Sequence, residues 1–88
     1  MQPSMLLRRV DPIYPPLAKA AGVSGVVNLR GVIGIDGRIR DLTVVSGNPL
    51  LVPATLAAVR QWLYRPTILS GDPVEVETEI VVTFTLNR

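Results

Sequence analysis

Hydrophobic and polar residues alternate most clearly near the C-terminus, over residues 74–86. The even positions carry a nearly unbroken apolar stripe, made of Val74, Val76, Thr78, Ile80, Val82, Phe84 and Leu86. The odd positions begin with three glutamates, Glu75, Glu77 and Glu79. A period of two predicts a β-strand with one face on a core and the other face in water. The rest of the chain must therefore supply that core and a neighbouring strand.

A similar alternation predicts an earlier strand over residues 26–35. Its inward stripe comprises Val27, Leu29, Gly31, Ile33 and Ile35. The dipeptide Asp36-Gly37 follows, and this pair favours a two-residue type I′ hairpin in which both residues have positive φ. A second strand then covers residues 38–45. Its apolar phase shifts near Arg40 and Asp41, which predicts a β-bulge there.

Two segments have the pattern of helices. In the first, Pro15 or Pro16 suits the opening turn, and Gly22 is expected as a left-handed cap after residues 17–21. The second is a predicted helix over residues 53–62. Its apolar residues follow helical spacing and form one face, made of Val52, Leu56, Val59 and Leu63. Pro66 prevents this helix from continuing. Residues 69–73 predict a turn that leads into the last strand.

The predicted order is therefore short helix, strand, strand, helix, strand within a single domain that covers residues 1–88. We expect an α+β fold in two layers, with a three-stranded antiparallel sheet packed on one main helix. A right-handed crossover makes the last strand parallel to the second. If the first strand takes the middle, the last strand lies at an edge of the sheet. Residues 1–7 are expected to fray or to form a short extra strand.

Composition limits the chemistry. Hydrophobic residues make up 48% of the 88 residues and charged residues 18%, as in a folded globular domain. The chain has no cysteine and no histidine, which excludes disulfides, thiol catalysis and the usual zinc sites. Its Ser, Thr and Tyr side chains have no histidine to activate them, so we expect no enzyme, no cofactor and no metal. The net charge of +2 comes without a dense basic run, which argues against a nucleic-acid partner.

Two groups of side chains have a structural and a functional interpretation. Glu75, Glu77 and Glu79 could be offered as calcium ligands, but alternate residues on a flat strand do not converge on one ion. A charged face in water, opposite Arg30 or Arg40, is the better interpretation. Trp62 and Tyr64 could form an aromatic platform, but two aromatic residues near the end of a helix are more often part of the core.

The edge position of the last strand suggests a function. An exposed edge presents unpaired N–H and C=O groups, which proteins normally protect. The glutamates discourage self-pairing in the first half of the strand, whereas residues 80–86 carry no charge. We therefore predict that a partner peptide adds to the second half as a further strand. The alternative, from another class of function, is a structural module that forms a homodimer through the same edge.

Several segments, taken in order, resemble one known family. They are Asp11-Pro12-Ile13-Tyr14-Pro15-Pro16-Leu17-Ala18, Gly25-Val26-Val27, Ile35-Asp36-Gly37-Arg38-Ile39, Ala57-Ala58-Val59-Arg60-Gln61-Trp62-Leu63-Tyr64-Arg65-Pro66, Gly71-Asp72-Pro73-Val74 and Val82-Thr83-Phe84. Together they resemble the C-terminal domain of TonB, the energy transducer of Gram-negative bacteria, over residues 8–87.

This resemblance implies a periplasmic domain that binds the TonB box of outer-membrane transporters as an added strand. The family's binding residues correspond here to Asp11, Pro12, Tyr14, Pro15, Glu79, Ile80, Val81, Val82, Thr83 and Phe84. It further implies inner-membrane energising proteins as partners and siderophores, cobalamin or glycans as cargo. The inner-membrane anchor and the proline-rich spacer of the family are absent from these 88 residues, so we expect binding without energy transduction from this chain alone. Leu63 also stands where the family commonly has a basic residue.

Overall fold

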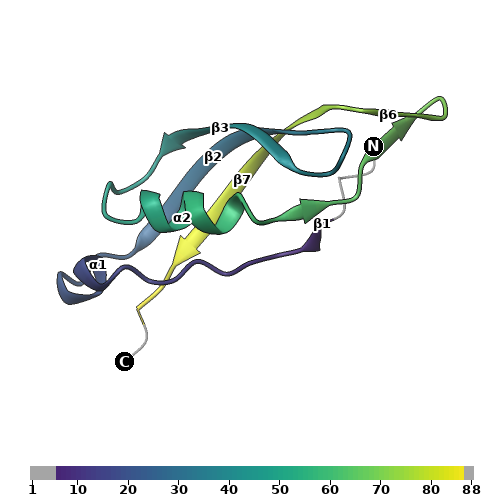
Figure 1. Ribbon diagram of the computed structural model, residues 1–88. Coiled ribbons are helices and arrows are strands. Elements are labelled where there is room, and N and C mark those ends of the chain that lie inside the picture. Colours follow the sequence, from purple (N-terminus) through teal and green to yellow (C-terminus); the bar gives the residue numbers. More distant parts are fainter. Residues whose placement is uncertain (1–5, 87–88) are drawn as a thin grey trace.

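A three-stranded antiparallel sheet forms the centre of the fold, as the sequence predicts (Figure 1). The structure is a computed structural model and describes residues 6–86. Strand β2 (Gly25–Ile33) lies in the middle, between β3 (Ile39–Ser46) and β7 (Val76–Phe84). Both neighbours run antiparallel to β2. The last strand is therefore at an edge, which confirms the predicted strand order.

Helix α2 (Val52–Val59) covers one face of this sheet and closes the core. The helix is shorter than the predicted span of residues 53–62. Its last turn tightens, with the Gln61 and Trp62 N–H groups bonded three residues back. This turn directs Trp62, which is 5% exposed, into the core, and Tyr64 is buried too. Both aromatic residues are thus core residues, as the structural interpretation predicted.

The buried face of α2 differs from the predicted one. Val52 and Leu56 are only partly buried, and Leu63 lies beyond the helix in strand β4 (Leu63–Tyr64). The side chain of Thr55 is fully buried instead. Its hydroxyl group donates to the Leu51 carbonyl at 2.9 Å, which satisfies the hydroxyl within the helix. Val59 of the predicted face is fully buried, and Val52 and Leu56 pack against the core, so the predicted face was right in part. An apolar count from the sequence could not foresee the buried threonine.

The connection between β2 and β3 is longer than a two-residue turn. Ile35 lies in this connection and is 52% exposed, so it does not belong to the inward stripe. Gly37 has a φ of 84°, whereas Asp36 does not have a positive φ, so the type I′ prediction was wrong. A three-residue loop is closed by bonds from Gly37 N–H to Gly34 and from Gly34 N–H to Arg38.

Glycine is also required at position 37 because the backbone of Tyr64 lies very close to it. A Cβ atom there would lie 2.1 Å from the carbonyl oxygen of Tyr64, so any side chain would force the two segments apart. The Tyr64 N–H donates to the Gly37 carbonyl at 2.8 Å, which holds β4 against the start of β3. The choice of loop is therefore set by contact with a strand that lies far away in the sequence.

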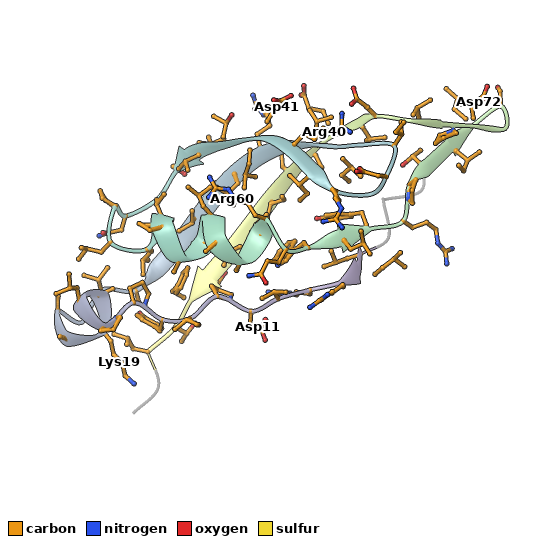
Figure 2. All side chains as sticks on the ribbon, in the orientation of Figure 1. Asp11, Lys19, Arg40, Asp41, Arg60 and Asp72 are labelled. Carbon is orange, nitrogen blue, oxygen red and sulfur yellow. The ribbon has the colours of Figure 1, made fainter. Side chains whose placement is uncertain are left out.

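Strand β3 contains the bulge that the sequence predicts. Its register against β2 shifts between the pairs Arg30↔Thr43 and Val32↔Arg40. Asp41 lies within the shift and has a φ of 51°. A second irregularity lies near the end of β3, between the partners of Asn28 and Leu29. In the view of Figure 2, Arg40 and Asp41 lie on the side of the sheet away from Asp11.

The predicted strand over residues 74–86 is divided in the structure. Strand β6 (Asp72–Val74) pairs with β5 (Thr67–Leu69) in a separate hairpin, and Glu75 separates β6 from β7. Ser70 and Gly71 form the turn, with φ values of 52° and 85°. The turn predicted at residues 69–73 is present, but the hairpin around it was missed. This hairpin projects from one end of the domain, whose principal extents are 50 × 21 × 20 Å (Figure 1).

The N-terminal part crosses the domain as an extended segment. The predicted extra strand exists as β1 (Leu6–Arg8), which pairs with β4, while residues 1–5 lie outside the described residues. Residues 9–15, called the strap below, lead to helix α1 (Pro16–Ala20). Gly22 follows with a φ of 69° and ends α1 as predicted. No helix within residues 6–86 has the length and hydrophobicity needed to span a bilayer.

Candidate functional site

The ten residues predicted to bind a partner lie in two places. Six of them, the range 79–84, belong to β7. The other four belong to the strap, and they are Asp11, Pro12, Tyr14 and Pro15. The structure brings the two groups together where the rings of Tyr14 and Phe84 meet edge to face, with centroids 5.4 Å apart. Asp11 instead pairs with Arg9, whose Nε atom lies 3.5 Å from the carboxylate.

The six residues on β7 divide by face. Ile80, Val82 and Phe84 are at most 4% exposed, so their side chains belong to the core and cannot contact a partner. Glu79, Val81 and Thr83 face water on the other side of the sheet, and Val81 is 59% exposed. We call this water-exposed side of the sheet the open face. A partner at this strand can reach three of the six side chains, together with the backbone along the edge.

The direction of the backbone groups on β7 follows from the register. The N–H of Gly34 donates to the Arg38 carbonyl at 2.8 Å, so the backbone groups of Gly34 face β3. Successive strand residues direct these groups to alternate sides, so Ile33 and every second residue before it face β7. Their partners on β7 are Val76, Thr78, Ile80 and Val82.

The remaining β7 residues therefore direct their N–H and C=O groups away from the sheet. These residues are Glu77, Glu79, Val81 and Thr83. In residues 6–86, β7 pairs with β2 alone, so no strand covers this outer edge. Nine consecutive residue pairs join β7 to β2 without a register shift, which keeps the edge straight and evenly spaced. Such an edge can accept a further strand through main-chain hydrogen bonds.

The strap is fixed to the core by two aromatic side chains. The Tyr14 hydroxyl donates to the Val23 carbonyl, and the indole Nε1–H of Trp62 donates to the Val10 carbonyl at 2.8 Å. The Arg9 guanidinium lies over the Trp62 ring, 5.3 Å from its centroid. The strap therefore has a defined position beside the C-terminal end of β7. The extended Pro-rich sequence predicted an extended segment, but not these anchors.

Charge is unevenly distributed along β7. Glu75, just before the strand, pairs with Arg40 at 3.4 Å, as the predicted charged face requires. Among residues 6–86, Glu77 and Glu79 take part in no ion pair. On strand β4, burial raises the pKa of the Tyr64 hydroxyl, and the positive charge of Arg9 partly opposes this rise. No three Asp, Glu, His or Cys side chains gather within residues 6–86 in a way that could hold a metal ion.

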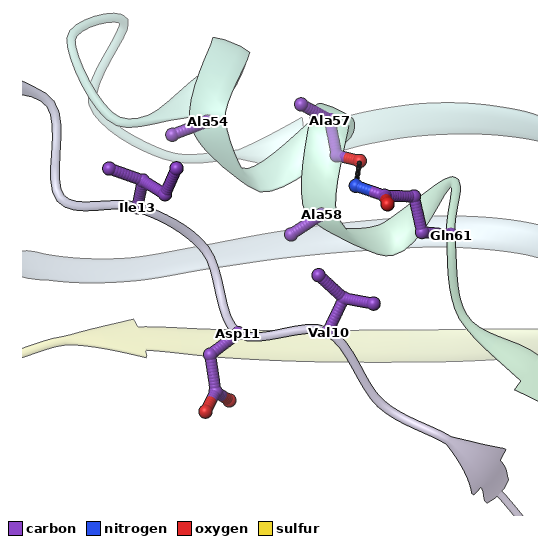
Figure 3. A pocket seen from close by; sticks show the side chains of 7 residues that line it. All are labelled: Val10, Asp11, Ile13, Ala54, Ala57, Ala58 and Gln61. Atoms are coloured by element: carbon purple, nitrogen blue, oxygen red, sulfur yellow. Dashed lines mark hydrogen bonds between the residues drawn. The ribbon is translucent and has the colours of Figure 1, made fainter.

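Hollows beside α2 are the features that the sequence did not reveal. One hollow of about 270 Å³ separates the strap from the helix (Figure 3). Its wall on the helix side consists of the short side chains of Ala54, Ala57 and Ala58, which leave the space open. A second, mainly apolar hollow is bordered by Ile13, Leu17, Leu50 and several prolines. The run of alanines was the available signal, but it also suits an ordinary packed helix.

Comparison with known proteins identifies the family. A family model described as the Gram-negative bacterial TonB protein C-terminal matches residues 10–86. Protein TonB of Vibrio cholerae is 31% identical over 87 residues, and Protein TonB of Pseudomonas aeruginosa is 29% identical over 84 residues. These matches cover 97% and 93% of this chain but only 36% and 25% of those proteins. The chain thus spans about a third of its relatives or less.

Solved structures agree with this result. The solution NMR structure of the Pseudomonas aeruginosa TonB CTD superposes with a TM-score of 0.80 at 28% sequence identity, covering 97% of this chain and 88% of that one. The TonB2 protein of Vibrio anguillarum gives a TM-score of 0.72 at 33% identity, covering 100% of this chain and 86% of that one. The fold and the sequence therefore point to one family. This chain belongs to the Gram-negative bacterial TonB C-terminal domain family.

Proposed function

We propose that this domain is the periplasmic end of an energy transducer and binds the TonB box of TonB-dependent outer-membrane transporters. The box adds to the outer edge of β7 as a further strand. Inner-membrane energising proteins act through an anchored N-terminal region of the protein, and the domain passes their pull to the transporter. The observation that carries this proposal is the regular outer edge of β7, which no strand covers within residues 6–86, in a domain of the TonB family. No catalytic step is involved.

The residues have distinct roles in this proposal. Val81 and Thr83 offer main-chain donors and acceptors to the box, because their backbone groups face outward and their partners on β2, Asn28 and Val26, are uncharged. Ile80, Val82 and Phe84 keep the strand rigid through their burial in the core. The strap residues Asp11, Pro12, Tyr14 and Pro15 border the end of the added strand, since Tyr14 contacts Phe84. A rigid edge reduces the entropy that is lost on binding.

A proline substitution at an outward-facing residue of β7 tests the proposal. Val81→Pro removes an outward N–H, so we expect the fold to persist while the affinity for a TonB-box peptide falls about tenfold or more. Val81→Ala keeps the N–H and is the matched control, with a clearly smaller loss of affinity than Val81→Pro because it removes only side-chain contacts. Binding is followed by amide chemical shifts during peptide titration. Shifts confined to α2, with the amides of β7 unchanged, would exclude strand addition.

The same edge also supports a second candidate function, homodimer assembly. Two copies of β7 can pair antiparallel about Ile80. This pairing places Glu79 opposite Val81 of the other copy and Glu77 opposite Thr83, so no like charges meet. Sedimentation over a range of concentrations separates the two functions. A tight dimer that Val81→Pro dissociates, together with no response to the peptide, would favour assembly over transporter binding.

A further inference from the structure

The outer edge of β7 is divided into a charged half and an uncharged half. Its exposed side chains follow the order Glu77, Glu79, Val81, Thr83 along the strand. These four residues also direct their backbone groups outward. Any strand added to the edge therefore lies beside two carboxylates and then beside two β-branched side chains. Cross-strand neighbours on one face lie about 4.5–5.5 Å apart at Cβ, close enough for direct interaction.

Neither of the two carboxylates forms an ion pair within residues 6–86. Glu77 lies opposite Val32, which carries no charge, and Glu79 lies opposite Arg30 without forming an ion pair. Glu75 differs, because Arg40 holds it at 3.4 Å. Arg30, Glu77 and Glu79 border a shallow open depression together with Thr78. The carboxylates at the edge are thus available to cations on a partner, whereas the neighbouring one is already paired.

The uncharged half has the opposite character. Val81 lies opposite Asn28, and Thr83 lies opposite Val26, so the direct cross-strand partners of both residues are uncharged. Val26 and Val81 are both exposed there. A charged residue on an added strand would gain nothing at these two positions. A β-branched residue would pack against Val81 and Thr83 and suits an extended strand.

From these observations we infer a specificity rule for the partner, which rests on the proposed strand addition. The strand that β7 accepts carries Lys or Arg at the two open-face positions beside Glu77 and Glu79. It carries uncharged, β-branched residues at the next two open-face positions, beside Val81 and Thr83. A strand with acidic residues beside Glu77 and Glu79 is rejected, because like charges directly opposite each other destabilise a strand pair. The charges thereby also set the register of the added strand.

Two synthetic peptides test this rule on the 88-residue chain. They are identical ten-residue strand formers, except that two alternate positions are lysine in one and glutamate in the other. Each complementary pair contributes up to about fivefold in affinity, so we expect about tenfold tighter binding of the lysine peptide. The double variant Glu77→Lys/Glu79→Lys should reverse this preference. Higher salt should reduce it in both proteins.

A matched double variant controls for overall charge. Asp72→Lys/Glu75→Lys changes the net charge by the same amount but leaves the edge of β7 intact, so the preference for the lysine peptide should persist. If this variant also reverses the preference, the preference depends on overall charge and not on the edge of β7, and the rule is overturned.

Failure of the rule is distinguishable from failure of the proposed function. If both peptides bind equally and Val81→Pro abolishes both, strand addition stands and the charge rule is wrong. If neither peptide binds, or if Val81→Pro leaves binding unchanged, strand addition itself is wrong and the rule falls with it.

Discussion

The two edges of the sheet present different surfaces. On β7, nine residues pair with β2 without interruption, and the outer backbone groups lie in one even row. On β3, the register shifts twice over eight residues, and Asp41 takes a positive φ. Bulges are a common way to stop an edge from pairing with other strands, because they twist the row of donors and acceptors. Of the two edges, only β7 has the regular backbone that the proposed strand addition requires.

The surroundings of the two sheet edges, β3 and β7, differ as well. Strand β4 borders the start of β3, through the bridge between Arg38 and Leu63 and the bond from Tyr64 to Gly37. The strap meets the end of β7, where Tyr14 contacts Phe84. One edge is thus irregular and partly covered, whereas the other is regular and open. This difference teaches that the proposed binding edge stands out by its regularity more than by any unusual side chain.

The largest expected effect comes from removing the anchor of the strap. Trp62→Ala leaves a cavity in the core and frees the Val10 carbonyl, so we expect the free energy of unfolding to fall by about 3–5 kcal/mol. Denaturant unfolding followed by circular dichroism measures this loss. Arg60→Ala, two residues away and exposed, should change stability by less than about 0.5 kcal/mol. Equal losses in the two variants would show that the indole is not part of the core.

A smaller effect is expected from the bulge on β3. Asp41→Val places a β-branched residue at a φ of 51°, which should cost about 1–2 kcal/mol. Asp41→Gly tolerates this φ and should be nearly neutral. If Asp41→Val were instead neutral and promoted self-association, β3 would have straightened, and the contrast between the two edges would depend on this one residue.

The smallest effect is expected from Tyr64, which lies on strand β4 beside the start of β3, and only at alkaline pH. Burial raises the pKa of Tyr64 above its unfolded value of about 10, so the unfolded chain loses its proton first. The contribution of Tyr64 to stability is therefore complete below about pH 10 and is lost as the pH rises through the pKa of the folded state. Tyr64→Phe should remove this part of the pH dependence. An identical alkaline decline in both proteins would assign it to other groups.

Much of the fold could be predicted because local signals agreed with the tertiary structure. Alternation located β2 and β7, prolines and Gly22 bounded α1, and the shifted phase of residues 38–45 located the bulge of β3. The errors arose where distant contacts decided the outcome. The loop at Gly37 is fixed by Tyr64, the buried face of α2 includes a self-satisfied Thr55, and the hairpin of β5 and β6 takes residues from the predicted last strand.

The features of the candidate site also divide into those that the sequence predicts and those that depend on contacts between distant segments. The sequence by itself determined an alternating strand within residues 74–86, with glutamates in its first half, because a period of two depends only on side-chain type. Which of these residues direct their backbone groups outward depends on the pairing with β2, and a shift by one residue would exchange the two sets. Only the tertiary structure decided that Glu77, Glu79, Val81 and Thr83 form the open row, since register is a relation between two strands.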